Sequence, residues 1–207
     1  MFVRATRLRA AAGGLDALID EFTGDIAPKL RAMPGNTGTV LLVDRKEGRA
    51  TALSYWKDQA ALDSSETAAT GLRTQATSST GATIEGVQRG EILMMEATAP
   101  PEAGRFIRTI MFSADPAQID AGVAHMRSTV LPALKALDGF RALICGANRD
   151  SGMGIVTTVW ETEADRDSTL TSQAGLREDA LAKFGAANVV IEAYESVQVD
   201  IEVPVTH

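Results

Sequence analysis

An internal duplication is the feature that most limits how this chain can fold. When the sequence is aligned with itself at an offset of 104 residues, positions 2–96 match positions 106–200 without a gap, and 23 of these 95 pairs are identical. A chain of this composition would give roughly 8 identities by coincidence. The sequence therefore predicts one repeat at residues 1–96 and a second at residues 105–203. Between them, residues 97–104 contain two prolines and a glycine, which is typical of a linker.

Each repeat is predicted to contain the order βαββαβ. A short β-like run, Phe2 to Leu8 or Phe106 to Phe112, precedes apolar residues at helical spacing, a hairpin, a second helix and a last strand. Pro28 and Pro132 stand at the same place in the first helix, where they are expected to kink or split it. Asp58 and Thr162 are placed to cap the second helix. This order is typical of the ferredoxin-like unit, an antiparallel sheet with both helices on one face.

The predicted hairpin strands are apolar on both faces. Val40 and Leu42 point to one side of the sheet, whereas Leu41 and Val43 point to the other. Because the helices can cover only one face, the second face needs a partner. We therefore predict an α+β fold in which the two repeats pack sheet to sheet as an intramolecular dimeric α/β barrel. The sequence is compatible both with a monomer of this internal pseudo-dimer and with a further homo-oligomer of it.

Composition excludes several classes of protein. The net charge is −7 and neither half of the chain is basic, so no nucleic-acid partner is expected. No stretch of 18 apolar residues is present, so no membrane partner is expected. The only cysteine, Cys145, cannot form an internal disulfide, and no Cys and His cluster has zinc-ligand spacing. A cytoplasmic protein without a metal site is the expectation.

Each repeat resembles the antibiotic biosynthesis monooxygenase (ABM) domains of the dimeric α+β-barrel superfamily. The motifs that carry this resemblance are Leu131-Pro132-Ala133-Leu134, the following Gly139-Phe140, and Val159-Trp160-Glu161-Thr162-Glu163, with looser equivalents in the first repeat. The resemblance implies a fused pseudo-dimer with a pocket between sheet and helices. Members of the family range from oxygenases through haem-degrading enzymes to proteins of no assigned activity, so it implies no particular cofactor.

Trp56 and Trp160 are the first candidates for a ligand pocket. They are the only tryptophans and occupy equivalent positions where the third strand meets the second helix. In oxygenases that this chain resembles, a tryptophan at this place lines the substrate cavity. Ser54 and Thr158 share a strand face with them and could hydrogen-bond a ligand. The alternative is that both tryptophans only seal the hydrophobic core.

Arg4 and Arg108, within the first strand of each repeat, are the remaining pocket candidates. Either could orient an anionic or enolate ligand. The structural alternative is an ion pair with Glu91 or Glu195 on the last strand, which this fold places next to the first.

Other recurring residues receive structural interpretations. The motifs Gly71-Leu72-Arg73 and Gly175-Leu176-Arg177 are interpreted as helix packing and surface ion pairs. His125 is expected to be a solvated helix residue, with an axial haem ligand or a general base as the alternative.

Three hypotheses of function follow. The first is an ABM-like barrel of unassigned activity that binds a small apolar or aromatic molecule between sheet and helices. The second is a cofactor-independent monooxygenase acting on an aromatic or polyketide-like phenol, with Trp160 or Trp56 stacking, Arg108 or Arg4 stabilising negative charge and Thr158 or Ser54 hydrogen-bonding. The third is haem binding through His125. No cofactor is expected under the first two.

Overall fold

The predicted βαββαβ order is present in both repeats. The structure is a computed structural model that describes residues 1–201, so the end of the predicted second repeat and His207 lie outside the described residues. The first repeat contains β1 (Phe2–Arg9), α1 (Leu15–Glu21), η1 (Phe22–Ile26), α2 (Ala27–Arg31), β2 (Asn36–Asp44), β3 (Arg49–Trp56), α3 (Gln59–Ser64), α4 (Glu66–Thr80) and β4 (Thr83–Ala97). The second contains β5 (Phe106–Ser113), η2 (Pro116–Gln118), α5 (Ile119–His125), η3 (Met126–Val130), α6 (Leu131–Lys135), β6 (Phe140–Asn148), β7 (Met153–Trp160), α7 (Glu163–Ser172), α8 (Ala174–Lys183) and β8 (Ala187–Ile201).

The strands follow the hydrogen-bonded order β1-β3-β2-β8-β5-β7-β6-β4 and close into a barrel. Both predicted hairpins are present, with Val43 opposite Ala50 in the first repeat and Ala147 opposite Gly154 in the second. The α+β fold class and the closed antiparallel barrel are therefore confirmed.

The chain divides into two compact units that share their last strands. One unit contains residues 1–89, 101–104 and 194–201, and the other contains residues 90–100 and 105–193. The second half of β8 pairs with β2, and the second half of β4 pairs with β6. Met94 of the first repeat accordingly belongs to the core of the second unit, and Val197 packs against the core of the first. Compact units and sequence repeats are different divisions of the chain, and the repeat boundaries at 1–96, 97–104 and 105–203 stay a prediction.

The first helix of each repeat contains a widened turn just before its proline. The amide of Ala27 donates to the Phe22 carbonyl and that of Leu131 to the Met126 carbonyl, five residues back, which makes η1 and η3 π-helical turns. Proline has no amide hydrogen and its ring clashes with the carbonyl four residues earlier. A π turn moves that carbonyl aside, so the helix continues through Pro28 and Pro132 as α2 and α6.

The second helix of each repeat begins at the predicted cap and then breaks. Asp58 Oδ1 accepts from the Ala61 amide at 2.8 Å, and Thr162 forms a reciprocal capping box with Asp165. The helix is interrupted at Ser65 in the first repeat and at Gln173 in the second. In each repeat a hydroxyl residue of this helix, Ser65 or Thr169, lies against the arginine of the first strand, which matters for the site below.

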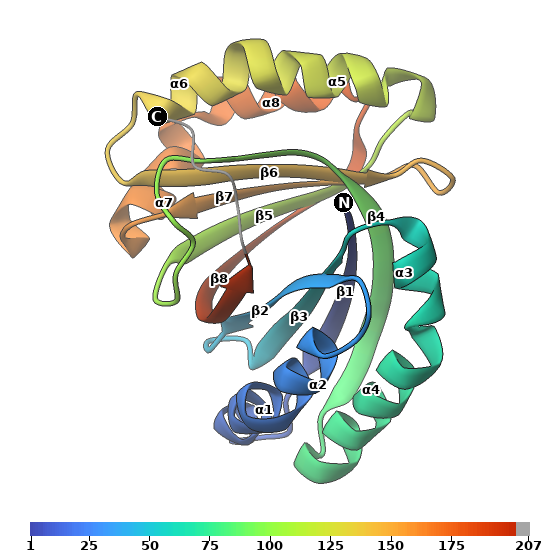
Figure 1. Cartoon of the computed structure of the whole chain (residues 1–207). Coiled ribbons are helices and arrows are strands. Elements are labelled where there is room, and N and C mark those ends of the chain that lie inside the picture. The colour runs from blue at the N-terminus through green and yellow to red at the C-terminus, as the bar shows by residue number, and fades with distance from the viewer. Residues whose placement is uncertain (202–207) are drawn as a thin grey trace. The chain divides into compact units, whose positions relative to one another are not determined.

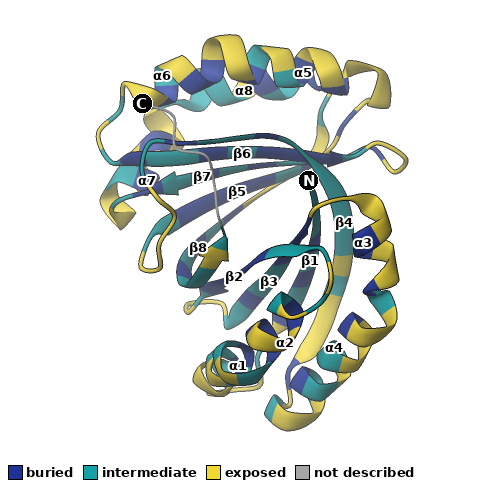
Figure 2. Ribbon diagram, in the orientation of Figure 1, coloured by how far each residue is buried: buried dark blue, intermediate teal, exposed yellow. Residues whose placement is uncertain are grey.

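The helices of each unit lie on one face of its sheet, as α5, α6 and α8 do over β5, β6 and β7 (Figure 1). Figure 2 shows that their buried residues face the strands and their exposed residues face away. Leu41 and Val43 are 1% and 0% exposed, and Val40 and Leu42 on the opposite face are 8% and 6% exposed. Burial on both faces explains why the strand sequence does not alternate between apolar and polar residues.

One pair of positions shows how the repeats have diverged in packing. A Cβ added to Gly122 would collide with the Phe184 ring, so the large ring occupies the space that the glycine leaves open. The equivalent positions of the first repeat hold Leu18 and Thr80. The large residue has changed place with the small one, which conserves the volume between the two helices.

Gly122→Leu should therefore lower the free energy of unfolding by about 1–3 kcal/mol, because the core becomes overpacked. The double variant Gly122→Leu/Phe184→Thr should recover part of this loss, as a coupling in a double-mutant cycle measured by urea unfolding. If the two losses simply add, the exchange of volume is not what relates the repeats.

Candidate functional site

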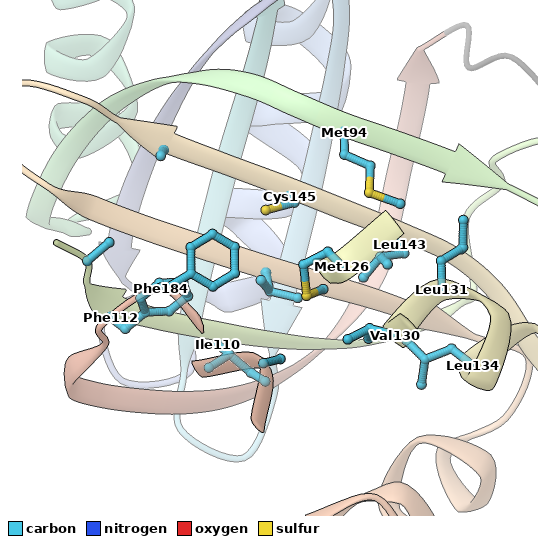
Figure 3. Close-up of a cluster of buried hydrophobic side chains, with 14 of the residues drawn as sticks. Met94, Ile110, Phe112, Met126, Val130, Leu131, Leu134, Leu143, Cys145 and Phe184 are labelled. Carbon is cyan, nitrogen blue, oxygen red and sulfur yellow. The ribbon is translucent and has the colours of Figure 1, made fainter. Parts of the chain in front are cut away.

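A cavity lies between sheet and helices in the second unit. Its volume is about 70 Å³, and it is lined mainly by apolar side chains of β5, β7, η3, α6 and α8. Figure 3 shows several of them, with Ile110 on strand β5, Met126, Val130 and Leu134 on η3 and α6, and Phe184 just after α8. The polar residues of the lining are Arg108, Thr158, Thr169, Gln173 and Arg177.

The first unit has a cavity at the equivalent place, with a volume of about 50 Å³. Its polar lining comprises Arg4, Thr6, Ser54 and Arg73. Three of these correspond to lining residues of the second cavity by the offset of 104: Arg4 to Arg108, Ser54 to Thr158 and Arg73 to Arg177. The duplication has therefore preserved the polar end of the cavity.

Both predicted tryptophans are buried and bonded to the hydroxyl residue predicted with them. Trp160 Nε1 donates to Thr158 Oγ1 at 2.9 Å, and Trp56 Nε1 donates to Ser54 Oγ at 3.1 Å. The two rings differ in one respect, because Trp160 lines its cavity whereas Trp56 does not line the first. Trp56 is 0% exposed and packs in the hydrophobic core, as the alternative interpretation expects. Trp160 both seals the core and forms part of a cavity wall.

The arginine in the first strand of each repeat is buried beneath the second helix. Arg4 donates to Ser65 Oγ at 3.0 Å and to the Leu62 carbonyl at 2.7 Å. Arg108 donates to the equivalent partners, Thr169 Oγ1 and the Arg166 carbonyl. The two side chains are 2% and 7% exposed. Burial lowers the pKa of each guanidinium, although both remain charged.

The predicted ion pairs of these arginines with the last strand are wrong. Glu195 pairs with Arg45 at 2.5 Å, and Glu91 pairs with Arg149 at 3.5 Å. The reason is the sharing of the last strands, because the half of β8 that carries Glu195 pairs with β2 and the half of β4 that carries Glu91 pairs with β6.

Glu66 is the carboxylate that Arg4 contacts instead. Its oxygens lie 2.8 Å from Arg4 Nη2 and 2.5 Å from Arg73 Nη2, and it also pairs with Arg89. Burial opposes the ionisation of Glu66, but the hydrogen bond from Arg73 and the three positive charges outweigh it, so its pKa lies below the ordinary value. Sequence reasoning missed this residue.

Arg73 and Arg177 were also missed as cavity residues. Their motifs were interpreted as surface ion pairs and helix packing, but both side chains line a cavity. The sequence signal that could have found them is that both repeats have an arginine at this equivalent position.

His125 does not line either cavity. Its Nε2 lies 2.8 Å from Asp179 Oδ2, and the side chain is 15% exposed, which is less than a solvated position would show. A haem group does not fit this arrangement, because the imidazole Nε2 already faces the Asp179 carboxylate and the side chain lines neither cavity. Within residues 1–201, no group of three or more metal-ligating side chains is found. Burial raises the pKa of the Cys145 thiol to about 12, which makes it a poor nucleophile.

One known family matches part of the first repeat. Residues 1–76 match the model of the family described as antibiotic biosynthesis monooxygenase. The second repeat has the same order of strands and helices, which supports its resemblance to the same family. Within residues 1–201, no helix is long and apolar enough to cross a membrane.

Two proteins of Mycobacterium tuberculosis, both described as uncharacterized, are similar in sequence to this chain. The uncharacterized protein Rv2557 is 26% identical over 99% of this chain and 91% of its own length. The uncharacterized protein Rv2558 is 28% identical over 68% of this chain and 59% of its own length.

Solved structures share the fold at low sequence identity. An anthrone oxidase-like protein superposes with a TM-score of 0.71 at 13% identity, covering 96% of this chain and 92% of the other. A heme-degrading enzyme from Listeria monocytogenes superposes with a TM-score of 0.53 at 10% identity, covering 94% and 99%. These similarities show the fold and leave the chemistry to the residues of the site.

The pairing of Glu66 predicts a pH dependence of stability. Because its pKa is lowered in the folded state, its ionisation stabilises the fold above its unfolded pKa of about 4.5, and this contribution is lost as pH falls through the folded value. Urea unfolding from pH 6 to pH 3 should therefore show a larger loss of stability for the wild type than for Glu66→Gln. Parallel curves would contradict the pairing.

Proposed function

We propose that this protein binds a small apolar or aromatic molecule in the cavity of the second unit. The observation that carries this proposal is the cavity itself. A cavity volume of about 10–15 Å³ is enough to hold one water molecule. A volume of about 70 Å³, lined mainly by apolar side chains, therefore suits an organic ligand better than a single water.

The polar atoms of this cavity give a ligand a preferred orientation. Thr158 Oγ1 accepts the bond from the Trp160 indole, so the hydroxyl hydrogen of Thr158 is left to donate to a ligand. The wall formed by Trp160 offers an aromatic face close to that hydroxyl. A flat ring carrying one oxygen acceptor matches both features.

A filling variant tests this proposal, with 2-naphthol as the fluorescent probe. Ala180 lines the second cavity, and its equivalent Ala76 lines the first. Ala180→Leu should weaken 2-naphthol binding by about tenfold or more, because the new side chain fills the space that the ring needs. Ala76→Leu is the matched control and should leave the affinity of the second cavity unchanged.

The proposal fails if the wild type does not bind 2-naphthol in a fluorescence titration. It also fails if Ala180→Leu and Ala76→Leu bind the probe as well as the wild type does, because the ligand would then lie elsewhere.

Cofactor-independent oxygenation is the second candidate. It is favoured by the buried Arg108, which could stabilise a substrate anion, and by the fold shared with the anthrone oxidase-like protein. In such a reaction anthrone and O₂ give anthraquinone and water. Among residues 1–201, no carboxylate or imidazole lines the cavity, so this chain would favour the substrate anion through positive charge and hold it beside Thr158.

Oxygen uptake with anthrone tests this candidate. Trp160→Phe should slow uptake severalfold, because Phe cannot donate the hydrogen bond that orients Thr158, whereas Trp56→Phe should have a smaller effect. Absence of uptake by the wild type would end the oxygenase candidate while leaving ligand binding intact.

A further inference from the structure

The two cavities differ in how their paired arginines are neutralised. In the first unit, Arg4 and Arg73 both contact the carboxylate of Glu66, at 2.8 Å and 2.5 Å. The position equivalent to Glu66 in the second repeat is Leu170, which has no charge. Of the two arginines that line the second cavity, Arg108 and Arg177, neither has the counterpart of this shared carboxylate.

The remaining contacts of Arg108 do not replace it. Asp167 Oδ1 lies 3.5 Å from Arg108 Nη2, and the same oxygen lies 2.7 Å from Arg166 Nε, so its charge is shared with a closer arginine. Asp167 is also 55% exposed, which weakens its attraction by solvent screening. Arg108 is thus a buried cation with only partial compensation.

Arg177 has less compensation still. Its Nη1 donates to the Leu170 carbonyl at 3.1 Å, and among residues 1–201 no carboxylate lies within ion-pair distance of it. Its positive charge acts on Arg108, since it is among the charges that lower the pKa of that guanidinium. Two positively charged side chains therefore line the polar end of the same apolar cavity, an arrangement that a bound anion would stabilise.

We propose that the second cavity binds a small amphipathic anion, an apolar body that carries a carboxylate, which takes between Arg108 and Arg177 the place that Glu66 holds in the first unit. This inference rests on the proposed function, because it adds a charged head to the ligand of the same cavity. The first cavity is closed to such a ligand because its arginines already have an internal carboxylate.

The first unit retains a weaker polar character. Arg4 Nε and Arg73 Nη1 are buried without a hydrogen-bond partner among the described residues. These atoms can donate to a neutral acceptor, but Glu66 already balances the charge beside them. Removing that carboxylate should therefore convert the first cavity into a second anion site.

The experiment compares 2-naphthoate with 2-naphthamide, which has nearly the same shape and no charge. Calorimetric titration of the whole chain should show one 2-naphthoate site per chain, with an affinity about tenfold or more above that of 2-naphthamide. Raising the salt concentration should weaken the binding of 2-naphthoate and leave that of 2-naphthamide nearly unchanged.

Leu170→Glu is the decisive variant. Leu170 is 45% exposed, and its carbonyl already accepts from Arg177, so a new carboxylate begins within reach of that guanidinium while the fold tolerates the change. It should abolish the preference for 2-naphthoate, whereas the uncharged control Leu170→Gln should retain it. In the reverse direction, Glu66→Gln should add a second 2-naphthoate site.

The outcomes separate this inference from the proposed function. Equal binding of 2-naphthoate and 2-naphthamide, or a preference that survives Leu170→Glu, would overturn the anion site and leave an apolar ligand cavity. A folded Glu66→Gln that still binds a single equivalent would contradict the role assigned to Glu66. If 2-naphthoate, 2-naphthamide and 2-naphthol all fail to bind the wild type, both proposals are overturned.

Discussion

The burial of an arginine in the first strand is the constraint on which the site depends. A guanidinium removed from water must be hydrogen-bonded and paired, because the loss of hydration otherwise costs several kcal/mol. Arg4 and Arg108 meet this requirement in the same way, with a hydroxyl from Ser65 or Thr169 and a carbonyl from the second helix. These bonds fasten the second helix to the sheet and make one end of each cavity polar.

Divergence after duplication acted on the surroundings of this shared arrangement. The exchange of Leu18 for Gly122 is balanced by a larger ring at Phe184, so packing is conserved. Within the part of the chain that the structure describes, the exchange of Glu66 for Leu170 is not balanced by a new carboxylate between Arg108 and Arg177. The first repeat therefore supplies its own counter-ion, whereas the second takes one from a ligand. The cavity of the second unit is also the larger of the two and has a tryptophan in its wall.

The fold could be predicted from sequence because the evidence for it is periodic and occurs twice. Helical spacing, the two prolines and the caps at Asp58 and Thr162 are local signals, and a strand that is apolar on both faces indicates a closed arrangement. The ion pairs could not be predicted. Glu91 and Glu195 stand on strand halves that pair outside the compact unit of their own repeat's arginine, and Glu66 meets Arg4 across 62 positions through a helix break that spacing does not reveal. Arg73 and Arg177 each line a cavity, which their position in the helical sequence does not reveal.

Nitrogen-15 NMR of the arginine side chains tests most directly the claim that only one arginine pair awaits an external anion. As 2-naphthoate is added to the whole chain, the guanidinium signals of Arg108 and Arg177 should shift together and saturate, because a carboxylate changes the hydrogen bonding of both. The signals of Arg4 and Arg73, already paired with Glu66, should stay in place. Shifts of Arg4 and Arg73 with no change at Arg108 and Arg177 would contradict the account.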